Sequence, residues 1–256
     1  MNIKRLFDVI VSLVALTCFA PVLIAFMFLI WRQDGYSPLY LAPRVGLDGK
    51  IFTMIKLRSM VINADQTGVD STGSLDPRIT SLGSTIRRFK LDEITQLWNV
   101  LVGDMSLVGP RPNVKRETDL YTVEERRLLS VTPGITDFAS LVFADEGDIL
   151  RDKYDPDLAY HQLIRPAKSE LGLFYIENRS FLLDLALVCL TAFAIFSRTK
   201  TLLVLSFILE RLGCSDQLRE VCLREKALIP RPPPGAYEIV TSRDGKIETG
   251  VKNGTV

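Results

Sequence analysis

Charged side chains of both signs gather in one stretch of the chain, RRFKLDEITQLWNVLVGDMSLVGPRP. It opens with three cations and two adjacent carboxylates: Arg87, Arg88, Lys90, Asp92 and Glu93. Arginines hold phosphate oxygens, and a carboxylate binds a divalent metal or attacks phosphorus. The combination predicts a site for a di-anionic substrate. Taken singly, each residue also fits a surface charge, and Asp92 fits the N-cap of a helix.

A guanidinium between two prolines, Arg111, closes this stretch. Proline restricts the backbone, and a fixed guanidinium fork suits a pyrophosphate. The alternative for Arg111 is a structural salt bridge, for example to Asp104. Other cations are expected to bind the same anion: Lys56, Arg58, Arg78, Arg87 and Arg88.

Composition narrows the class of cofactor and partner. The 256 residues carry a net charge of +1, and the aromatic residues lie in apolar runs, so nucleic-acid binding is not expected. His161 is the single histidine, and the cysteines lack metal-ligand spacing. A metal here should therefore be a hard, oxygen-ligated ion, and Mg²⁺ is expected. There is no Walker loop and no GxGxxG motif.

An uncharged segment, residues 9–31, is long enough to span a hydrocarbon core of roughly 30 Å. Pro21 predicts a kink near its middle. Basic residues flank both ends, and positive charge favours the cytoplasmic side, so a helix that enters the membrane and returns is physically sensible. A kinked span and a cleaved signal peptide are the alternatives at this point.

Beyond this segment the fold class expected is mostly α with short extended segments (α+β). Extended pieces are expected over 34–62 and a mobile polar loop over 63–76. Two helices should follow, one capped by Ser84 or Thr85 and one from an Asp92 cap to Gly103, and then helical segments around 116–130 and 158–176. An interfacial helix is expected over 185–197, followed by two amphipathic pieces broken near Gly213 and a polar tail. The domains predicted are a membrane helix over 1–33, a catalytic domain over 34–200, and C-terminal amphipathic helices with a polar tail over 201–256.

Four motifs resemble those of the monotopic bacterial sugar transferases, which are small polyprenyl-phosphate phosphoglycosyl transferases. They are KLRSM (56–60), DPRIT (76–80), LDEITQLWNVLVGDMSLVGPRP (91–112) and TPGIT (132–136). The likeness runs from KRLFDVIVSL to about residue 198. It implies an N-terminal re-entrant helix broken at a proline, which matches Pro21, joined to a small cytoplasmic catalytic domain with interface helices.

The resemblance also implies an activity. Enzymes of this family move a phospho-sugar from a UDP-sugar to a polyprenyl phosphate and release UMP. They act on the cytoplasmic face of the bacterial inner membrane, at the first membrane step of glycoconjugate assembly. The family's Asp-Glu dyad matches Asp92 and Glu93. Asp92 is then the nucleophile that forms a covalent phosphosugar intermediate and contacts Mg²⁺, and Glu93 assists proton transfer with the lipid phosphate.

The chain departs from the family pattern at several positions. Thr95 replaces a common proline, Ala42 a common glutamine, Ala20 the usual serine before the proline, and TDFAS (136–140) the common TG-x-AQ. These departures leave the dyad intact, but they leave the sugar and nucleotide preference open. The sequence also does not identify the polyprenol or the pathway, and it leaves open whether the protein forms a homodimer. Two other functions compete with this interpretation: a lipid-phosphate transferase of another class in which Asp92 only binds metal, and an inactive membrane-anchored scaffold.

Overall fold

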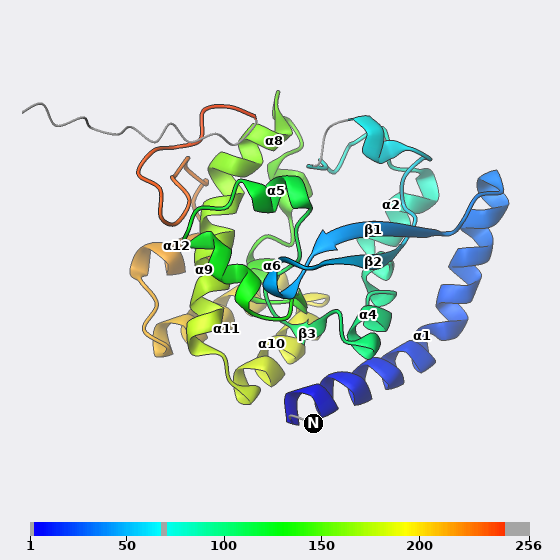
Figure 1. Cartoon of the computed structure of the whole chain (residues 1–256), viewed down its shortest axis with the longest axis horizontal. Helices are drawn as coiled ribbons and strands as arrows, with labels where there is room; N and C mark the ends of the chain where they lie inside the picture. Colours follow the sequence, from blue (N-terminus) through cyan, green and yellow to red (C-terminus); the bar gives the residue numbers. More distant parts are fainter. Residues whose placement is uncertain (1–2, 68–70, 244–256) are drawn as a thin grey trace, which may run out of the picture.

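A long N-terminal helix, α1 (Ile3–Asp34), lies along one side of the protein (Figure 1). The computed structural model describes residues 3–67 and 71–243. The strands are β1 (Leu39–Val45), β2 (Ile51–Leu57), β3 (Ser106–Val108) and β4 (Gly134–Thr136). The helices after α1 are α2 (Ser81–Arg88), α3 (Leu91–Ile94), α4 (Leu97–Val102), α5 (Lys115–Asp119), α6 (Phe138–Val142), α7 (Glu146–Ile149), α8 (Pro156–Ala159), α9 (Arg165–Asn178), α10 (Phe181–Ala194), α11 (Arg198–Arg211) and α12 (Asp216–Leu223). Single helical turns are Leu47–Gly49, Ala64–Thr67, Glu125–Ser130 and, as a π-helical turn, Tyr160–Ile164.

This content confirms the mostly α class with short extended segments, since helices make up 57% of the structure. The extended pieces expected over 34–62 form the antiparallel hairpin of β1 and β2, in which Leu39 faces Leu57 and Val45 faces Ile51. A second, parallel pair joins β3 to β4, with Ser106 opposite Gly134.

Helix α1 remains helical through Pro21 and bends (Figure 1). Proline removes one backbone hydrogen bond and clashes with the turn before it. One turn earlier, the hydroxyl of Thr17 donates to the carbonyl of Leu13 at 2.8 Å, a back-bond that often bends helices. The expected kink is therefore confirmed, while the path of α1 relative to a membrane stays a prediction.

The N-terminal end of α1 is bound to the rest of the protein through its charged residues. Arg5 donates to the carbonyls of Val100 and Leu101, in the last turn of α4. A cation suits this place because the carbonyls of a helix C-terminus lack partners and carry partial negative charge. The buried carboxylate of Asp8 accepts hydrogen bonds from the Ser106 hydroxyl at 2.8 Å and from the Leu107 amide at 3.3 Å.

The C-terminal end of α1 is bound to the same body. Arg58, directly after β2, donates through both terminal nitrogens to the carboxylate of Asp34, one of them at 2.6 Å. Its Nε donates to the Ser37 carbonyl at 2.8 Å. Both ends of α1 are therefore anchored to the domain that follows it.

The helix expected after the polar loop begins earlier than the sequence suggested. Thr80 caps α2, and its hydroxyl accepts from the Gly83 amide at 2.9 Å, so the expected cap at Ser84 or Thr85 is wrong. Thr80 also donates its amide to the carbonyl of Ser59 at 3.1 Å. This strand-like pairing ends at Thr80, and the helix starts there.

The helix expected from Asp92 to Gly103 forms as two short helices, α3 and α4. Gly103, at φ 103°, ends α4 as expected. The N-cap at Asp92 is wrong, because Lys90 occupies that position with φ 52° and Asp92 lies inside the first turn of α3. The Gln96 amide bonds to the Glu93 carbonyl at 3.1 Å across the junction, so the helical direction is kept.

The main core lies between α6, α9, α10 and α11, where Phe138, Leu171, Leu187 and Leu205 are buried. A second cluster joins the far half of α1 to β2, α2 and α3 through Leu23, Ile30, Leu57, Ile86 and Leu91. Helix α11 crosses the predicted boundary at residue 200 and packs in the main core. The division into 1–33, 34–200 and 201–256 stays a prediction.

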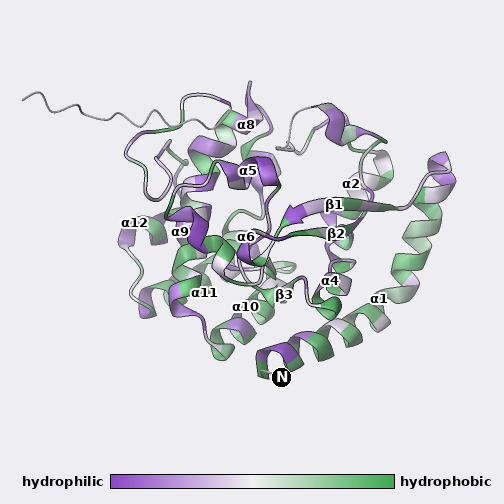
Figure 2. Cartoon of the chain, in the orientation of Figure 1, coloured by the Kyte–Doolittle hydropathy of each residue, from purple (hydrophilic) through white to green (hydrophobic). Residues whose placement is uncertain are grey.

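Much of the apolar surface of α1 remains uncovered. Figure 2 shows α1 as hydrophobic along most of its length and hydrophilic at both ends. Within the described residues, α1 is the one helix long and apolar enough to cross a membrane, and its exposed apolar side chains include Ile10, Leu13, Ile24, Phe28 and Trp31. Such an exposed apolar surface is typical of membrane association.

A second uncovered apolar region belongs to α10, where an interfacial helix was expected over 185–197. The helix starts earlier, because Ser180 caps it through a hydrogen bond from the Leu183 amide at 3.2 Å. Ile195 and Phe196, just after its end, are more than four-fifths exposed.

In the polar loop expected over 63–76, Ala64–Thr67 forms a turn. Residues 68–70 and 244–256, which include most of the polar tail, lie outside the described part of the chain.

Candidate active site

Three segments bring four charged side chains together: Lys56 from β2, Asp92 and Glu93 from α3, and Arg111 from the loop after β3. The Lys56 ammonium lies 3.8 Å from the Asp92 carboxylate. The Arg111 Nη2 donates to Glu93 Oε1 at 2.7 Å. The dyad expected from the sequence is thus flanked by two of the six cations proposed to bind substrate.

Helices α3 and α4 are held against β2 by the polar side chains of Thr95, at the end of α3, and Asn99, within α4. The Thr95 hydroxyl donates to the carbonyl of Ile55 at 3.0 Å. The Asn99 amide group accepts from the Ile55 amide at 3.0 Å and donates to the Thr53 carbonyl at 2.7 Å. These bonds occupy the backbone of β2 beside Lys56, and they explain why Asp92 and Lys56 meet.

The loop carrying Arg111 is positioned by an unusually close approach of two backbones. A Cβ on Gly134 would lie 2.1 Å from the amide nitrogen of Gly109, so the crossing requires glycine. The Arg111 Nη1 donates to the Ile135 carbonyl at 3.2 Å. The salt bridge considered for Arg111 therefore exists, but its partner is Glu93 and not Asp104.

The two carboxylates of the dyad differ in their electrostatic setting. Burial raises the pKa of Asp92, and this effect outweighs the attraction of Lys56. Burial also acts to raise the pKa of Glu93, but Arg111, Lys90 and Lys56 lower it to about 2. Glu93 is thus held ionised by its ion pair, whereas Asp92 is the carboxylate less committed to a partner.

Burial also changes the cation beside Asp92. Desolvation and the nearby Arg111 lower the pKa of Lys56 to about 8, against the opposing effect of Asp92 and Glu93. Glu93 raises the pKa of Arg111, which stays charged. An anionic ligand at this place would stabilise the charged form of Lys56.

The remaining predicted cations divide into two groups. Arg87 lies close enough to Asp92 to lower its pKa, and its buried Nη1 has no hydrogen-bond partner among the described residues. Arg88 is exposed and lies 5.7 Å from the Phe89 ring centre. Arg58 is engaged by α1, and Arg78 binds Asp76 in the loop before α2, with Nη2–Oδ2 at 2.7 Å. Substrate binding by Arg58, Arg78, Arg87 and Arg88 stays a prediction.

Charged residues that the sequence analysis did not propose as site residues lie near Arg111. Lys168 of α9 bonds to Glu146 at 3.0 Å and lies 5.3 Å from the Tyr160 ring centre. Asp137, directly after β4, is buried, and both Lys168 and Arg111 lie close enough to lower its pKa. The substitution of TG-x-AQ by TDFAS was the one sequence signal for Asp137.

A fully buried amide also lies within this segment. Gln96 follows the dyad by one helical turn, and neither its oxygen nor its nitrogen has a partner among the described residues. A buried, unpaired polar group costs about 1–3 kcal/mol.

The donor set can hold a magnesium ion only with help from a ligand. Within residues 3–67 and 71–243 there is no group of three or more histidine, cysteine or acidic side chains arranged for a metal. Mg²⁺ is commonly bound by one or two carboxylates together with substrate phosphates and water. Asp92 fits that role beside a diphosphate, whereas Glu93 is occupied by Arg111.

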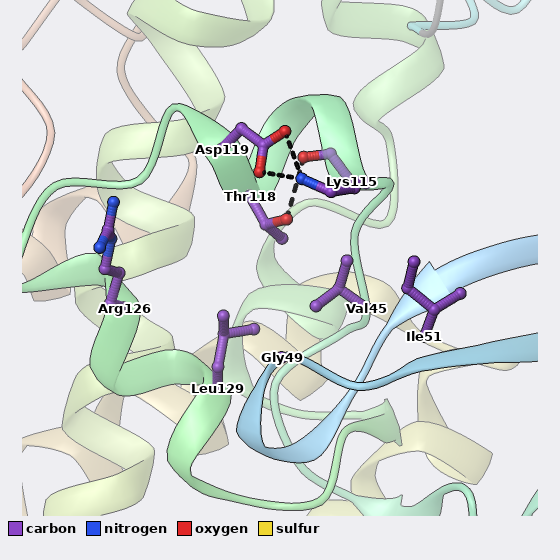
Figure 3. A pocket seen from close by; sticks show the side chains of 8 residues that line it. All are labelled: Val45, Gly49, Ile51, Lys115, Thr118, Asp119, Arg126 and Leu129. Atoms are coloured by element: carbon purple, nitrogen blue, oxygen red, sulfur yellow. Dashed lines mark hydrogen bonds and ion pairs between the residues drawn. The ribbon is translucent and has the colours of Figure 1, made fainter.

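A cavity lies outside the dyad, at the tip of the β1–β2 hairpin. Its volume is about 330 Å³, and Val45, Ile51, Thr118 and Leu129 contribute to its wall (Figure 3). The ion pair of Lys115 and Asp119 at its rim is more than half exposed. A smaller cavity beside Arg111 shares two wall residues with it, but the dyad lines neither cavity.

Comparison with known proteins gives the family. A model described as bacterial sugar transferase matches residues 1–198. The uncharacterized sugar transferase EpsL of Bacillus subtilis is 38% identical over 195 residues, which cover 75% of this chain and 86% of that protein.

Two relatives carry more specific names. A UDP-N-acetylgalactosamine-undecaprenyl-phosphate N-acetylgalactosaminephosphotransferase of Aeromonas hydrophila is 33% identical over 191 residues, 73% of this chain and 42% of that protein. An undecaprenyl-phosphate galactose phosphotransferase of Salmonella typhimurium is 39% identical over 149 residues, 52% of this chain and 31% of that protein. This chain thus spans less than half of either protein. By the family match and the similarity to EpsL, the chain belongs to the bacterial sugar transferase family.

Proposed function

We propose that this protein transfers a phospho-sugar from a UDP-sugar to a polyprenyl phosphate and releases UMP. The observation that carries the proposal is the meeting of Asp92 with Lys56 and with the Glu93–Arg111 pair. Names of relatives support the substrate classes, since they specify undecaprenyl phosphate with galactose or N-acetylgalactosamine. The pathway proposed is bacterial polysaccharide or glycoprotein glycan assembly.

The reaction proposed has two displacements at phosphorus. A carboxylate oxygen of Asp92 attacks the phosphorus nearer the sugar, and the bond to the bridging oxygen breaks, so that UMP leaves with the electron pair. A phosphate oxygen of the polyprenyl phosphate then attacks the same phosphorus and releases the Asp92 carboxylate. Asp92 suits the nucleophilic role because its ion pair with Lys56, at 3.8 Å, is longer than the 2.7 Å ion pair of Glu93 with Arg111.

Cations around the dyad would offset the repulsion between a carboxylate and a diphosphate. Arg111 supplies a fixed fork, Lys56 a partly buried ammonium, and Arg87 a buried Nη1 without a partner among the described residues. Charge-assisted hydrogen bonds of this kind stabilise developing negative charge. Mg²⁺, held by Asp92 and the donor's phosphates, would supply further Lewis-acid stabilisation.

The role proposed for Glu93 depends on whether its ion pair with Arg111 is closed or open. A carboxylate with a pKa of about 2 is a weak proton acceptor at neutral pH. Proton transfer by Glu93 thus requires its ion pair with Arg111 to open first. In the paired arrangement Glu93 orients Arg111.

The membrane arrangement proposed is a re-entrant α1 on the cytoplasmic face of the bacterial inner membrane. Arg5 binds α4 at one end of α1, and Asp34 binds Arg58 at the other. A helix whose two ends bind one domain cannot leave those ends on opposite sides of a bilayer while the contacts persist. The bend at Pro21 lets the apolar middle enter the lipid, where the polyprenyl phosphate resides.

The test is the Asp92→Asn variant, purified in detergent and incubated with UDP-sugars and undecaprenyl phosphate. UMP release should fall by about 10³-fold or more, with no phosphosugar adduct in intact-protein mass spectra and an unchanged circular dichroism spectrum. Asp119→Asn, which changes an exposed carboxylate outside the dyad, is the matched control and should keep wild-type activity. Substantial UMP release by Asp92→Asn would exclude the covalent scheme.

A further inference from the structure

A buried carboxylate, that of Asp137, lies at the same sheet edge as Arg111. Strands β3 and β4 are parallel, with Val108 opposite Thr136, and the Gly109 amide donates to the Thr136 carbonyl at 3.0 Å. Arg111 follows β3 and Asp137 follows β4. Carboxyl ends of parallel strands meet at one edge, so Arg111 and Asp137 follow this pair of strands at the same edge.

The two oxygens of this carboxylate are unequally used. Oδ1 accepts from the amide and from the hydroxyl of Ser140, both at 2.7 Å. No described residue donates to Oδ2, although Asp137 is only 2% exposed. Oδ2 can therefore accept a hydrogen bond from a donor outside the chain.

The neighbouring cations do not form an ion pair with Asp137. Arg111 is bound to Glu93 at 2.7 Å, and Lys168 is bound to Glu146 at 3.0 Å. Both lie close enough to lower the pKa of Asp137, against the larger effect of burial, which raises it. Asp137 thus has cations nearby but no ion pair within the described part of the chain.

The structural duty of Asp137 does not require a carboxylate. Asp137 caps α6, and asparagine or serine at an N-cap is about as effective as aspartate. Capping α6 therefore requires neither the second oxygen nor the negative charge of Asp137. A purely structural role leaves these two features unexplained, whereas a contact with a ligand explains them.

We propose that Asp137 determines donor specificity by accepting a hydrogen bond from a hydroxyl or amide N–H of the transferred sugar. The inference rests on the proposed function and adds the residue that distinguishes one UDP-sugar from another. A phosphate has no proton to donate and would be repelled by this carboxylate, whereas a sugar has several donors. The sugar is bonded to the phosphate that Asp92 attacks, and Asp137 lies near Arg111, whose ion pair with Glu93 is next to that carboxylate.

Asp137→Asn distinguishes a ligand contact from a structural role, because it keeps the helix cap but replaces the Oδ2 acceptor by a donor. With its oxygen accepting from Ser140, the asparagine must turn its NH₂ toward the place of Oδ2, where a donor then meets a donor. The wild type and the variant are compared with UDP-glucose, UDP-galactose, UDP-N-acetylglucosamine and UDP-N-acetylgalactosamine, by UMP release. Asp137→Ser, which also caps a helix, provides a second variant.

The expected result is a change of about tenfold or more in the ratio of kcat/KM between the best donor and its epimer, in both variants. Inhibition by UMP and the melting temperature should stay at their wild-type values. Ser140→Ala, which removes only a hydroxyl bond to Oδ1, is the control and should leave the ratio unchanged.

Three outcomes would overturn the inference. An unchanged ratio excludes a sugar contact, and weaker UMP inhibition with an unchanged ratio assigns Asp137 to the nucleoside. An equal loss with every donor, together with a lower melting temperature, assigns it to the cap alone. A wild-type protein that releases no UMP from any donor contradicts the proposed function itself, and is thereby distinguished from these three.

Discussion

Single side chains at the dyad acquire their chemical character from their immediate neighbours. Asp92 and Glu93 are adjacent in the sequence, yet burial raises the pKa of one and Arg111 lowers that of the other to about 2. Lys56, close to Asp92, has a pKa lowered to about 8 by burial. Two chemically similar carboxylates thus separate into a weakly paired group and an ion-paired one.

The lowered pKa of Lys56 predicts a pH dependence of donor use. As pH rises through about 8, Lys56 loses its charge and its attraction for the anionic donor. Because kcat/KM reports the free enzyme, it should fall by about tenfold per pH unit above that value. Steady-state UMP release between pH 6.5 and 9.5 measures this.

Lys56→Arg tests the cause, since a guanidinium stays charged over the whole range. This variant should lose the alkaline fall, even if its maximum is lower. Lys50→Arg, at an exposed position on the same hairpin, should keep the wild-type profile. A fall near pH 8 that persists in Lys56→Arg would assign the titration to another group.

Arg111→Lys is expected to weaken the interaction with the UDP-sugar. Lysine keeps a positive charge beside Glu93 but loses the fork that contacts both Glu93 and the Ile135 carbonyl. A lost charge-assisted contact of about 1.5–3 kcal/mol lowers kcat/KM by roughly ten- to a hundredfold. Steady-state kinetics and thermal unfolding are measured together, with Arg126→Lys, an exposed arginine, as the control.

A purely structural Arg111 would give the opposite pattern. The melting temperature of Arg111→Lys would then fall, while the folded fraction kept wild-type kcat/KM toward the donor. That result would remove Arg111 from the substrate site.

At the scale of the elements, backbone contacts decide where the cations of α2 lie. Gly83 packs directly on the segment after β2, and a Cβ there would lie 1.8 Å from the Ser59 carbonyl oxygen. The capping bond of Thr80 and the amide bond to Ser59 hold the same corner. The orientation of Arg87 thus depends on a glycine four residues earlier.

Gly83→Ala is expected to destabilise the protein, because backbone atoms must move to admit the methyl group. Overpacking typically costs about 1–3 kcal/mol, and the displaced α2 should also raise KM for the donor through Arg87. Chemical denaturation and donor kinetics measure the two effects. Ser84→Ala, at the next and exposed position, is the control, and a wild-type midpoint for Gly83→Ala would refute this account of α2 packing.

At the scale of the whole molecule, α1 is attached to one domain at both ends and leaves its apolar middle uncovered. Polar contacts involve Arg5 and Asp8 near the start of α1 and Asp34 at its end. Outer apolar side chains such as those of Leu13, Ile24 and Phe28 are more than half exposed. These two facts together favour a helix that enters a membrane and returns.

A labelling experiment tests this topology. Single cysteines replace Ile3 and Ser37, one at each end of α1, in a background without the four native cysteines. In the proposed re-entrant arrangement both ends face the cytoplasm, so neither cysteine should react with an impermeant thiol reagent in intact cells. Both should react after the cells are permeabilised, and labelling of position 3 alone in intact cells would demonstrate a true span.

The sequence by itself determined the features that depend on local chemistry. A long charge-free run predicts α1, Pro21 predicts its bend, and the spacing of apolar residues after Asp92 predicts helix up to Gly103. The dyad and its arginines are recognisable because their residue types are themselves the chemistry. The mostly α class follows from the same periodic patterns.

Only the tertiary structure decided which charges meet. Arg58 and Lys56 are two residues apart, yet Arg58 pairs with Asp34 and Lys56 approaches Asp92. Likewise Arg111 binds Glu93, and Asp137 reaches the same sheet edge through the pairing of β3 with β4. These partners are distant in sequence, and their encounter depends on how the packed elements cross, which local periodicity does not encode.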